Sequence, residues 1–190
     1  MSLRTPAPTK DPAMYRQLSF ERVDNDAYYT PNWCTEALLS RVTFRGRVWE
    51  PAAGKGRMAA VLRAADYDVV ESDIDPEETR LDFLTCKAML GDTTSIVTNP
   101  PYYIAVKFVR HALALALPAG GMVAMLLRHE FDCAKTRRYL FERPEFREKL
   151  TLTTRPRWIA GPTGNAPRHN FAWYVWDATH RGPPTLGWVP

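Results

Sequence analysis

The sequence predicts an α/β fold in which a mostly parallel β-sheet is covered by helices on both faces. Short apolar segments with strand character alternate along the chain with segments of helical length, which is the pattern of consecutive strand–helix–strand units. One early strand leads directly into a glycine turn and the start of a helix, which brings backbone close to a ligand at the carboxyl edge of a sheet. The length of 190 residues fits one such domain.

Local signals define the elements of the first half. A helix is predicted to begin at Thr30, a good N-cap residue, with Pro31 in the first helical position. Trp33, Ala37 and Leu38 then share its buried face. The next predicted elements are a strand at 47–50, a helix at 56–65, a strand at 68–73 and a weaker strand at 81–84.

In the second half, a short buried strand at 95–98 runs into two prolines, and a long, largely buried helix follows at 102–117. The remaining predicted elements are an apolar strand at 122–127, a charged helical insertion at 132–150 and a final strand at 170–177. The segment Gly182-Pro183-Pro184 is expected to stop regular structure. These assignments divide the chain into a flexible tail at 1–23, a single domain at 24–180 and a C-terminal tail at 181–190.

The composition, with 45% hydrophobic and 24% charged residues, is typical of a globular domain in water. No apolar segment approaches the roughly 20 residues that span a bilayer, and the first residues lack the apolar region of a secretory signal. We therefore expect a cytoplasmic protein without a membrane partner. Cys34, Cys86 and Cys133 are far apart and have no nearby histidine, which predicts reduced, mostly buried thiols and no metal site.

The segment from Glu50 to Gly56 is the first candidate for a ligand site. Its glycines and Ala59 fit the spacing of dinucleotide-binding loops, so a nicotinamide cofactor is one alternative. However, Glu50 ends the strand where a carboxylate would repel a pyrophosphate, and Pro51-Ala52-Ala53 delays the turn. A carboxylate at this point suits a cationic ligand. S-adenosylmethionine, which carries an ammonium and a sulfonium, is therefore the expected cofactor.

Further acidic residues follow downstream of the glycine loop. Asp73 ends the second strand, where its carboxylate can accept hydrogen bonds from both ribose hydroxyls, and Ile74 can lie on one face of the adenine. Asp82 and Phe83 are expected to contact the adenine amine and its other face. The structural alternatives are turn chemistry for Asp73 and a loop cap for Asp82. The order of these residues after the glycine loop favours ligand binding.

The segment Asn99-Pro100-Pro101-Tyr102 is the most informative in the chain. Each proline holds the preceding residue extended and offers no N–H, so the segment presents acceptors: the Asn99 side-chain oxygen and the Pro100 carbonyl. Two acceptors can bind both hydrogens of a planar amine such as adenine N6 and free its lone pair for in-line attack on a sulfonium methyl group. Tyr102 can stack on the base, which must leave a duplex to be reached. A plain proline-rich turn is the structural alternative.

At these motifs the sequence resembles the DNA adenine-N6 methyltransferases of the gamma motif order, over about residues 28–177. The resemblance implies a Rossmann-like, S-adenosylmethionine-dependent methyltransferase fold, with a seven-stranded sheet whose last strand, here 170–177, is antiparallel. It implies that Asn99, Pro100, Pro101 and Tyr102 are catalytic and that Phe171 is a second base-stacking residue. The cofactor-binding residues that it implies are Tyr29, Thr30, Pro31, Glu50, Pro51, Ala53, Gly54, Gly56, Asp73, Ile74, Asp82, Phe83 and Asn99.

Positive charge is concentrated in the second half of the chain. Residues 1–98 carry a net charge of −3 and residues 99–190 a net charge of +7. A polyanion facing the second half is the functional interpretation, and solvation of an ordinary surface is the structural one. We expect residues 131–170 to face DNA. The expected phosphate-binding residues are Lys135, Arg137, Arg138 and Arg168, and the other arginines of this region are Arg143, Arg147, Arg155 and Arg157.

Together these observations predict methyl transfer from S-adenosylmethionine to the N6 amine of a flipped adenine in duplex or single-stranded DNA. Because the chain ends soon after the last predicted strand, we expect a very short target, low specificity or a specificity partner protein. Enzymes that methylate RNA or a protein glutamine amide share the Asn-Pro-Pro-Tyr motif and are the nearest alternatives. A non-catalytic DNA- or cofactor-binding module is another. Restriction–modification and phage biology are the contexts that fit.

Overall fold

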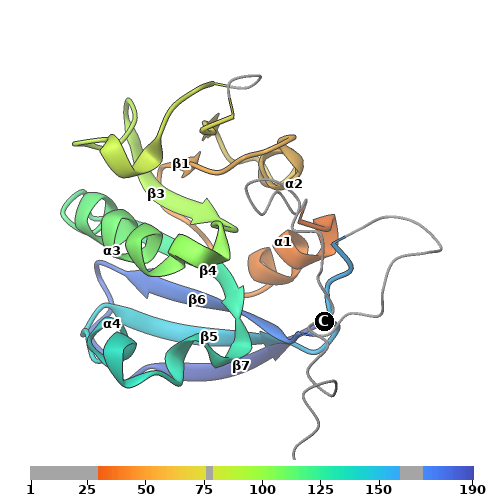
Figure 1. Ribbon diagram of the computed structural model, residues 1–190, viewed down its shortest axis with the longest axis vertical. Coiled ribbons are helices and arrows are strands. Elements are labelled where there is room, and N and C mark those ends of the chain that lie inside the picture. The colour runs from red at the N-terminus through yellow and green to blue at the C-terminus, as the bar shows by residue number, and fades with distance from the viewer. Residues whose placement is uncertain (1–29, 76–78, 159–168) are drawn as a thin grey trace, which may run out of the picture.

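The computed structural model describes residues 30–75, 79–158 and 169–190, and its strands form one seven-stranded sheet (Figure 1). The strands, in spatial order, are β2 (Val69–Glu71), β1 (Arg47–Glu50), β3 (Thr93–Thr98), β4 (Met122–Arg128), β6 (Phe171–Asp177), β5 (Phe146–Leu152) and β7 (Thr185–Val189). The helices are α1 (Asn32–Leu39), α2 (Arg57–Ala64), α3 (Ala105–Ala116) and α4 (Arg138–Phe141), with short 3-10 helices η3 (Phe83–Thr85), η4 (Tyr102–Ile104), η5 (His129–Asp132) and η6 (Lys135–Arg137).

Six strands of the sheet run in one direction and one runs in the other. The parallel pairs are β2 with β1, β1 with β3, β3 with β4 and β5 with β7, whereas β6 is antiparallel to both of its neighbours. The predicted α/β class and the mostly parallel seven-stranded sheet are therefore confirmed. The antiparallel strand lies at 171–177, as predicted, but β7 follows it in the chain, so it is not the last strand.

Buried residues on both faces explain why the inner strands read as continuous apolar runs. Consecutive residues of a strand point to opposite faces. Val48 and Val97 accordingly lie in one hydrophobic cluster, and Trp49 and Ile96 lie in the other. The first cluster is completed by α1 and α2, and the second by α3 and α4, which lie on opposite sides of the sheet in Figure 1. The predicted covering of both faces is confirmed.

The segment 132–150 is not the predicted helical insertion. Only a single turn of it, α4, is α-helical, and residues 146–152 form β5 inside the sheet. The charges of this strand are neutralised internally. Lys149, which is 6% exposed, donates to the Asp132 carboxylate at 2.8 and 2.9 Å and to the His129 carbonyl at 2.8 Å. In the sequence, such a buried and paired charge cannot be distinguished from a charge on the solvent-exposed face of a helix, which explains why a helix was predicted.

Three further expectations also need correction. The prediction of a C-terminal tail at 181–190 is wrong, because residues 185–189 form β7. The prediction of a weak strand at 81–84 is also wrong, because the 3-10 helix η3 begins within this segment. The cysteines are free, as predicted, but only Cys34 is buried and Cys133 is exposed. The predicted tail at 1–23 lies outside the described residues, and within those residues no helix is long and apolar enough to cross a membrane.

Gly121, the residue before β4, is expected to tolerate no side chain. A Cβ at this position would lie 1.7 Å from the carbonyl oxygen of Thr94, which is held in the sheet by β3. We predict that Gly121→Ala lowers the free energy of unfolding by about 3 kcal/mol, measured by urea denaturation. Gly91→Ala is the control, because nothing lies within 4 Å of its Cβ and only its φ of 61° opposes the change. Equal losses in the two variants would contradict the steric explanation.

Candidate functional site

The carboxyl edge of the sheet brings the predicted motifs together. The parallel strands β1 and β3 end there at Glu50 and Thr98, and the antiparallel β6 begins there at Phe171. Asn99 follows β3 directly, and its Nδ2 donates a hydrogen bond to Thr30 Oγ1 at 3.2 Å. Thr30 therefore does not cap α1, for which the N-cap is Pro31, but orients the side chain of Asn99.

The glycine loop lies beside Asn99's strand and is fixed by Asp73. Gly54 and Gly56 adopt φ values of 51° and 68°, which favour glycine. The Gly54 N–H donates to Asp73 Oδ2 at 2.8 Å, and the Asp75 N–H donates to Asp73 Oδ1 at 2.9 Å. Asp73 thus holds the loop, as the turn interpretation predicts. Because a carboxylate has about four acceptor positions, this does not exhaust its capacity to bind hydroxyl groups.

Glu50 is the most unusual titratable group of this edge. Its side chain is buried, with 2% of the residue exposed, and its Oε2 has no hydrogen-bond partner among the described residues. Burial raises the pKa of its carboxyl well above the usual range, and the negative charge of Glu71 adds to the effect. A hydrogen bond from the Ala59 backbone opposes the shift only in part. A buried carboxylate with a vacant oxygen suits a cation that brings its own positive charge.

The residues predicted to contact an adenine differ in their surroundings. Ile74 is 57% exposed, so its side chain is accessible to a ligand. Asp82 accepts a hydrogen bond from the Leu84 N–H at 2.9 Å, in agreement with its interpretation as a cap. Phe83 is 1% exposed and packs against Trp49 and Phe108, with ring centroids 5.1 and 4.9 Å apart. The structure places Phe83 in the core instead of at a ligand surface.

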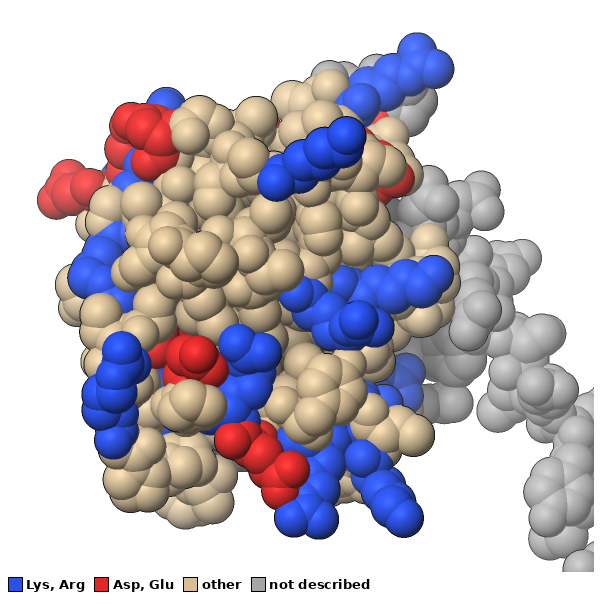
Figure 2. All heavy atoms as spheres, turned by 90° about the vertical axis from the view of Figure 1, so that its left-hand side faces the viewer, with Lys and Arg blue, Asp and Glu red and all other residues tan. Residues whose placement is uncertain are grey.

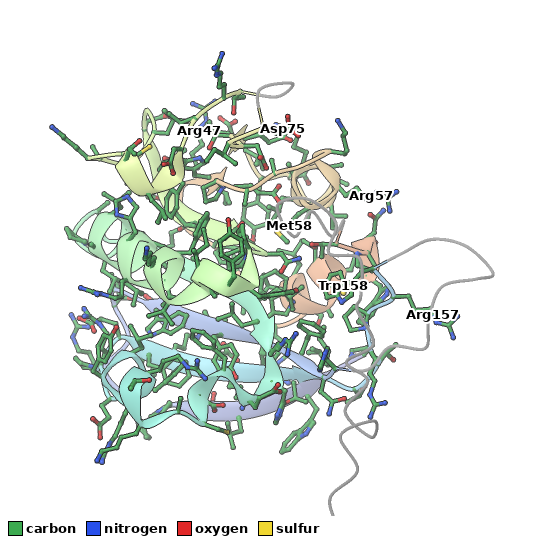
Figure 3. All side chains as sticks on the ribbon, viewed as in Figure 1. Arg47, Arg57, Met58, Asp75, Arg157 and Trp158 are labelled. Carbon is green, nitrogen blue, oxygen red and sulfur yellow. The ribbon has the colours of Figure 1, made fainter. Side chains whose placement is uncertain are left out.

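Tyr102, Trp158 and Phe171, which we call the aromatic cluster, lie next to Asn99 at the same edge. The ring centroids of Tyr102 and Phe171 are 5.5 Å apart, and those of Trp158 and Phe171 are 4.9 Å apart in an edge-to-face contact. The sequence predicted that both Tyr102 and Phe171 stack on the base, but Phe171 is 2% exposed and lies in the first hydrophobic cluster, so only Tyr102 is accessible to a base. The sequence gave no sign of Trp158, which belongs to the segment after β5 (Figure 3). The available signal was its chemical type, an aromatic residue directly after Arg155 and Arg157.

Most of the arginines predicted to bind phosphate are occupied by partners within the protein. Arg137 donates to the Phe131 carbonyl and covers the Phe131 ring. Arg138 pairs with Glu142, Arg143 with Glu145, and Arg147 with Glu148 and Asp177. On the side of the molecule where α4 lies, basic and acidic side chains are interspersed (Figure 2). Lys135 is exposed, and Arg168 and the predicted cofactor residue Tyr29 lie outside the described residues.

Arg128 is a residue of the carboxyl edge that the sequence interpretation missed. It ends β4 and is the direct ladder partner of Phe171, so it lies beside the aromatic cluster. Arg128 is exposed and forms no ion pair within the described part of the chain. Arg155 lies close by, because its Nε donates to Asn170 Oδ1 at 2.7 Å, and Arg157 extends outward next to Trp158 (Figure 3).

Solved methyltransferase structures share this fold at low sequence identity. The methyltransferase subunit of a type I restriction-modification system from Streptococcus thermophilus aligns with a TM-score of 0.54 and 14% identity, over 80% of this chain and 45% of its own. A putative RNA methyltransferase from Pyrococcus horikoshii aligns with a TM-score of 0.56 and 14% identity, over 79% of this chain and 85% of its own. The 23S rRNA methyltransferase ErmE aligns with a TM-score of 0.51 and 21% identity, over 83% and 70%.

These comparisons establish the fold, which is Rossmann-like and of the methyltransferase type, as the sequence predicted. The chain spans less than half the length of the restriction-modification subunit. No family model matches the chain, and no curated protein matches it in sequence.

Proposed function

We propose that this chain is an S-adenosylmethionine-dependent methyltransferase that acts on the N6 amine of adenine in DNA. One observation carries the proposal. The Asn99 side-chain oxygen is buried and accepts no hydrogen bond from any residue that the structure describes, at the carboxyl end of β3 and next to the aromatic cluster. A buried acceptor left without a donor is costly, which indicates that a ligand supplies the donor.

The residues of the glycine loop fit the cofactor. Glu50 offers a buried carboxylate oxygen to a cationic amino group, and Ile74 offers an exposed apolar surface to an adenine ring. Asp73 follows shortly after β2, which ends at Glu71, and acidic residues in this region of nucleotide-binding sheets accept ribose hydroxyls. When bound there, S-adenosylmethionine supplies a methyl group on a positively charged sulfur. The methyltransferase folds with which the chain aligns support this assignment.

The chain's own contribution to the reaction is to hold the amine. The Asn99 oxygen and the Pro100 carbonyl accept the two N6 hydrogens, and Tyr102, supported by the buried Phe171, holds the ring of the base. With its hydrogens bound, the nitrogen directs its lone pair at the methyl carbon. With S-adenosylmethionine held by Glu50 and the glycine loop, the N–C bond would form as the C–S bond breaks, its electron pair would stay on sulfur, and the methylated amine would release one proton to solvent.

DNA is favoured over the neighbouring substrate classes by the resemblance of the motifs and by the likeness to a restriction-modification subunit. The likeness to RNA methyltransferases makes RNA the second candidate. Because the restriction-modification neighbour is one subunit of a larger system, a specificity protein is proposed as a partner of this chain, and copurification tests for it.

The test is incorporation of a labelled methyl group into four substrates: duplex DNA, single-stranded DNA, RNA and a protein glutamine substrate. Digestion of the product to nucleosides and mass spectrometry then identifies the methylated base. We expect N6-methyladenine in DNA. Label found only in RNA would transfer the proposal to RNA, and label found only in protein would refute it. Calorimetry with S-adenosylmethionine and with a nicotinamide dinucleotide distinguishes the cofactor alternatives.

A further inference from the structure

We infer that the substrate of this site is single-stranded nucleic acid and that Trp158 stacks on a nucleotide next to the target base. The inference rests on the proposed function, since it specifies the strand state of the same substrate. It follows from three features of the carboxyl edge: the number of rings in the aromatic cluster, their spacing, and the position of the cations that have no acidic partner.

The aromatic cluster has one ring more than a single extruded base requires. Tyr102, which is only partly buried, suffices to stack on a target base beside Asn99, and Phe171, which is 2% exposed, supports Tyr102 from the first hydrophobic cluster. Trp158 makes an edge-to-face contact with Phe171 at a centroid distance of 4.9 Å and lies 6.4 Å from Tyr102, so it adds a second ring beside Tyr102. It is only partly buried. Surfaces that bind single strands use successive aromatic rings for successive bases.

The spacing of the rings indicates how the base is placed. A base sandwiched between two rings needs them about 7 Å apart, which is twice the stacking distance of roughly 3.4 Å. Tyr102 and Phe171 are 5.5 Å apart and tilted by 39°. Because Phe171 is 2% exposed, a target base stacks on Tyr102 or moves Tyr102 away from Phe171. Both routes are easier for a strand whose bases are unpaired, because extrusion from a duplex also breaks pairing.

Three cations without acidic partners follow the same path as the rings. Arg128 faces Phe171 in the sheet ladder, and Arg157 precedes Trp158 in the chain. Arg155 is fixed beside them by Asn170 at 2.7 Å. The arginines of α4 and of the turn after it are instead bound to carboxylates. Among the described residues, Arg128, Arg155 and Arg157 thus form a narrow line of positive charge beside the aromatic cluster, which suits one strand better than the two backbones of a duplex.

Equilibrium binding tests the inference without requiring catalysis. The probes are a fluorescently labelled DNA oligonucleotide of about 12 nucleotides with one adenine and the same oligonucleotide in a duplex, measured by anisotropy at several salt concentrations. We expect the wild-type chain to bind the single strand at least about tenfold more tightly than the duplex. Trp158→Ala should weaken single-strand binding about tenfold and leave duplex binding unchanged. Trp158→Phe should restore most of the loss.

Two further variants separate stacking from charge and from damage to the fold. Arg128→Ala should weaken both probes and lower the salt slope by about one, as expected for one lost phosphate contact. Tyr139→Ala is the matched aromatic control, because this residue of α4 is 46% exposed and lies outside the aromatic cluster. It should bind both probes like the wild type. In turnover assays, Trp158→Ala should raise KM for the single strand with little change in kcat.

The outcomes distinguish this inference from the proposed function. Equal or tighter binding of the duplex overturns the inference, as does a Trp158→Ala variant that weakens both probes equally. If duplex DNA is methylated as efficiently as the single strand, the inference is wrong and the proposed function stands. If the single strand binds in a Trp158-dependent way but no DNA is methylated, the proposed function is wrong and the strand preference stands.

Discussion

The Asn99→Ala variant is expected to lose a factor of about 100 to 1000 in kcat while it still binds the cofactor. The Asn99 oxygen is one of two acceptors that we assign to the N6 hydrogens, and it has no other hydrogen-bond partner in the described part of the chain. Without it the amine is held at one hydrogen only, and its lone pair is no longer directed at the methyl carbon. Single-turnover kinetics with saturating cofactor and substrate measure the loss.

Thr30→Val is the matched control for this prediction. It preserves the shape of the side chain but removes the hydroxyl that accepts the Asn99 Nδ2 hydrogen at 3.2 Å. The acceptor oxygen of Asn99 is then still present but less well oriented, so we expect a loss of about tenfold. An Asn99→Ala variant that retains more than about a tenth of the wild-type kcat would contradict the assigned role.

The Glu50→Gln variant is expected to bind S-adenosylmethionine at least about 100-fold more weakly, yet to be more stable than the wild type without ligand at neutral pH. The carboxylate is the group that we assign to the cationic end of the cofactor. In the free protein the same carboxyl is buried and its pKa is raised well above the usual range, chiefly by burial. A neutral amide of the same shape removes the cost of that burial and also the attraction to the cation.

The pH dependence has opposite signs for folding and for binding. Because the folded-state pKa of Glu50 is higher than its unfolded value, the free protein loses stability as pH rises from the unfolded pKa to the folded one. A cation prefers the ionised carboxylate, so cofactor affinity rises as pH increases through the folded pKa, with release of a proton. Both dependences should be absent in Glu50→Gln.

Thermal unfolding and calorimetry across the pH range check these expectations. Glu71→Gln is the control, since Glu71 is the second cause of the raised pKa but is not assigned to the ligand. It should lower the pKa of Glu50, move the rise in affinity to lower pH and leave the affinity at high pH within a few-fold of the wild type. A Glu50→Gln variant with unchanged cofactor affinity would refute the assignment of the cofactor's cationic group.

The parts of the fold that the sequence predicted are those whose residues follow simple patterns. β3 and β4 are uninterrupted apolar runs, and α3 has a clear apolar stripe. β5 was mistaken for helix because Glu148 and Lys149 are charged, although both are buried in the sheet. Their neutralisation depends on Asp132 and Arg147, and no local pattern reveals such tertiary pairing.

In the candidate site, too, the residues that follow a simple sequence pattern were predicted and those that depend on tertiary structure were not. Asn99, Glu50 and Asp73 were predicted from residue chemistry at the ends of strands, and the structure brings them to one edge. Arg128 was missed because only the sheet register places it opposite Phe171. Trp158 was missed because its position depends on the course of the loop after β5, which the sequence does not reveal. The role predicted for Phe83 was wrong because a hydrophobic residue beside a polar one can face either a ligand or the core. In the structure, Phe83 packs against three rings of the core.

The parallel direction of β7 has a practical consequence for protein engineering. Because β7 runs parallel to β5, its final residue reaches the edge that carries Glu50 and Asn99, where the Val189 carbonyl accepts a hydrogen bond from the Thr153 N–H at 2.9 Å. Thr153 is only a few residues from Trp158 along the chain. Under the proposed function, a sequence-specific DNA-binding module fused after Pro190 is therefore expected to be tethered at the edge that carries Asn99, and a short linker is expected to direct methylation to chosen sites.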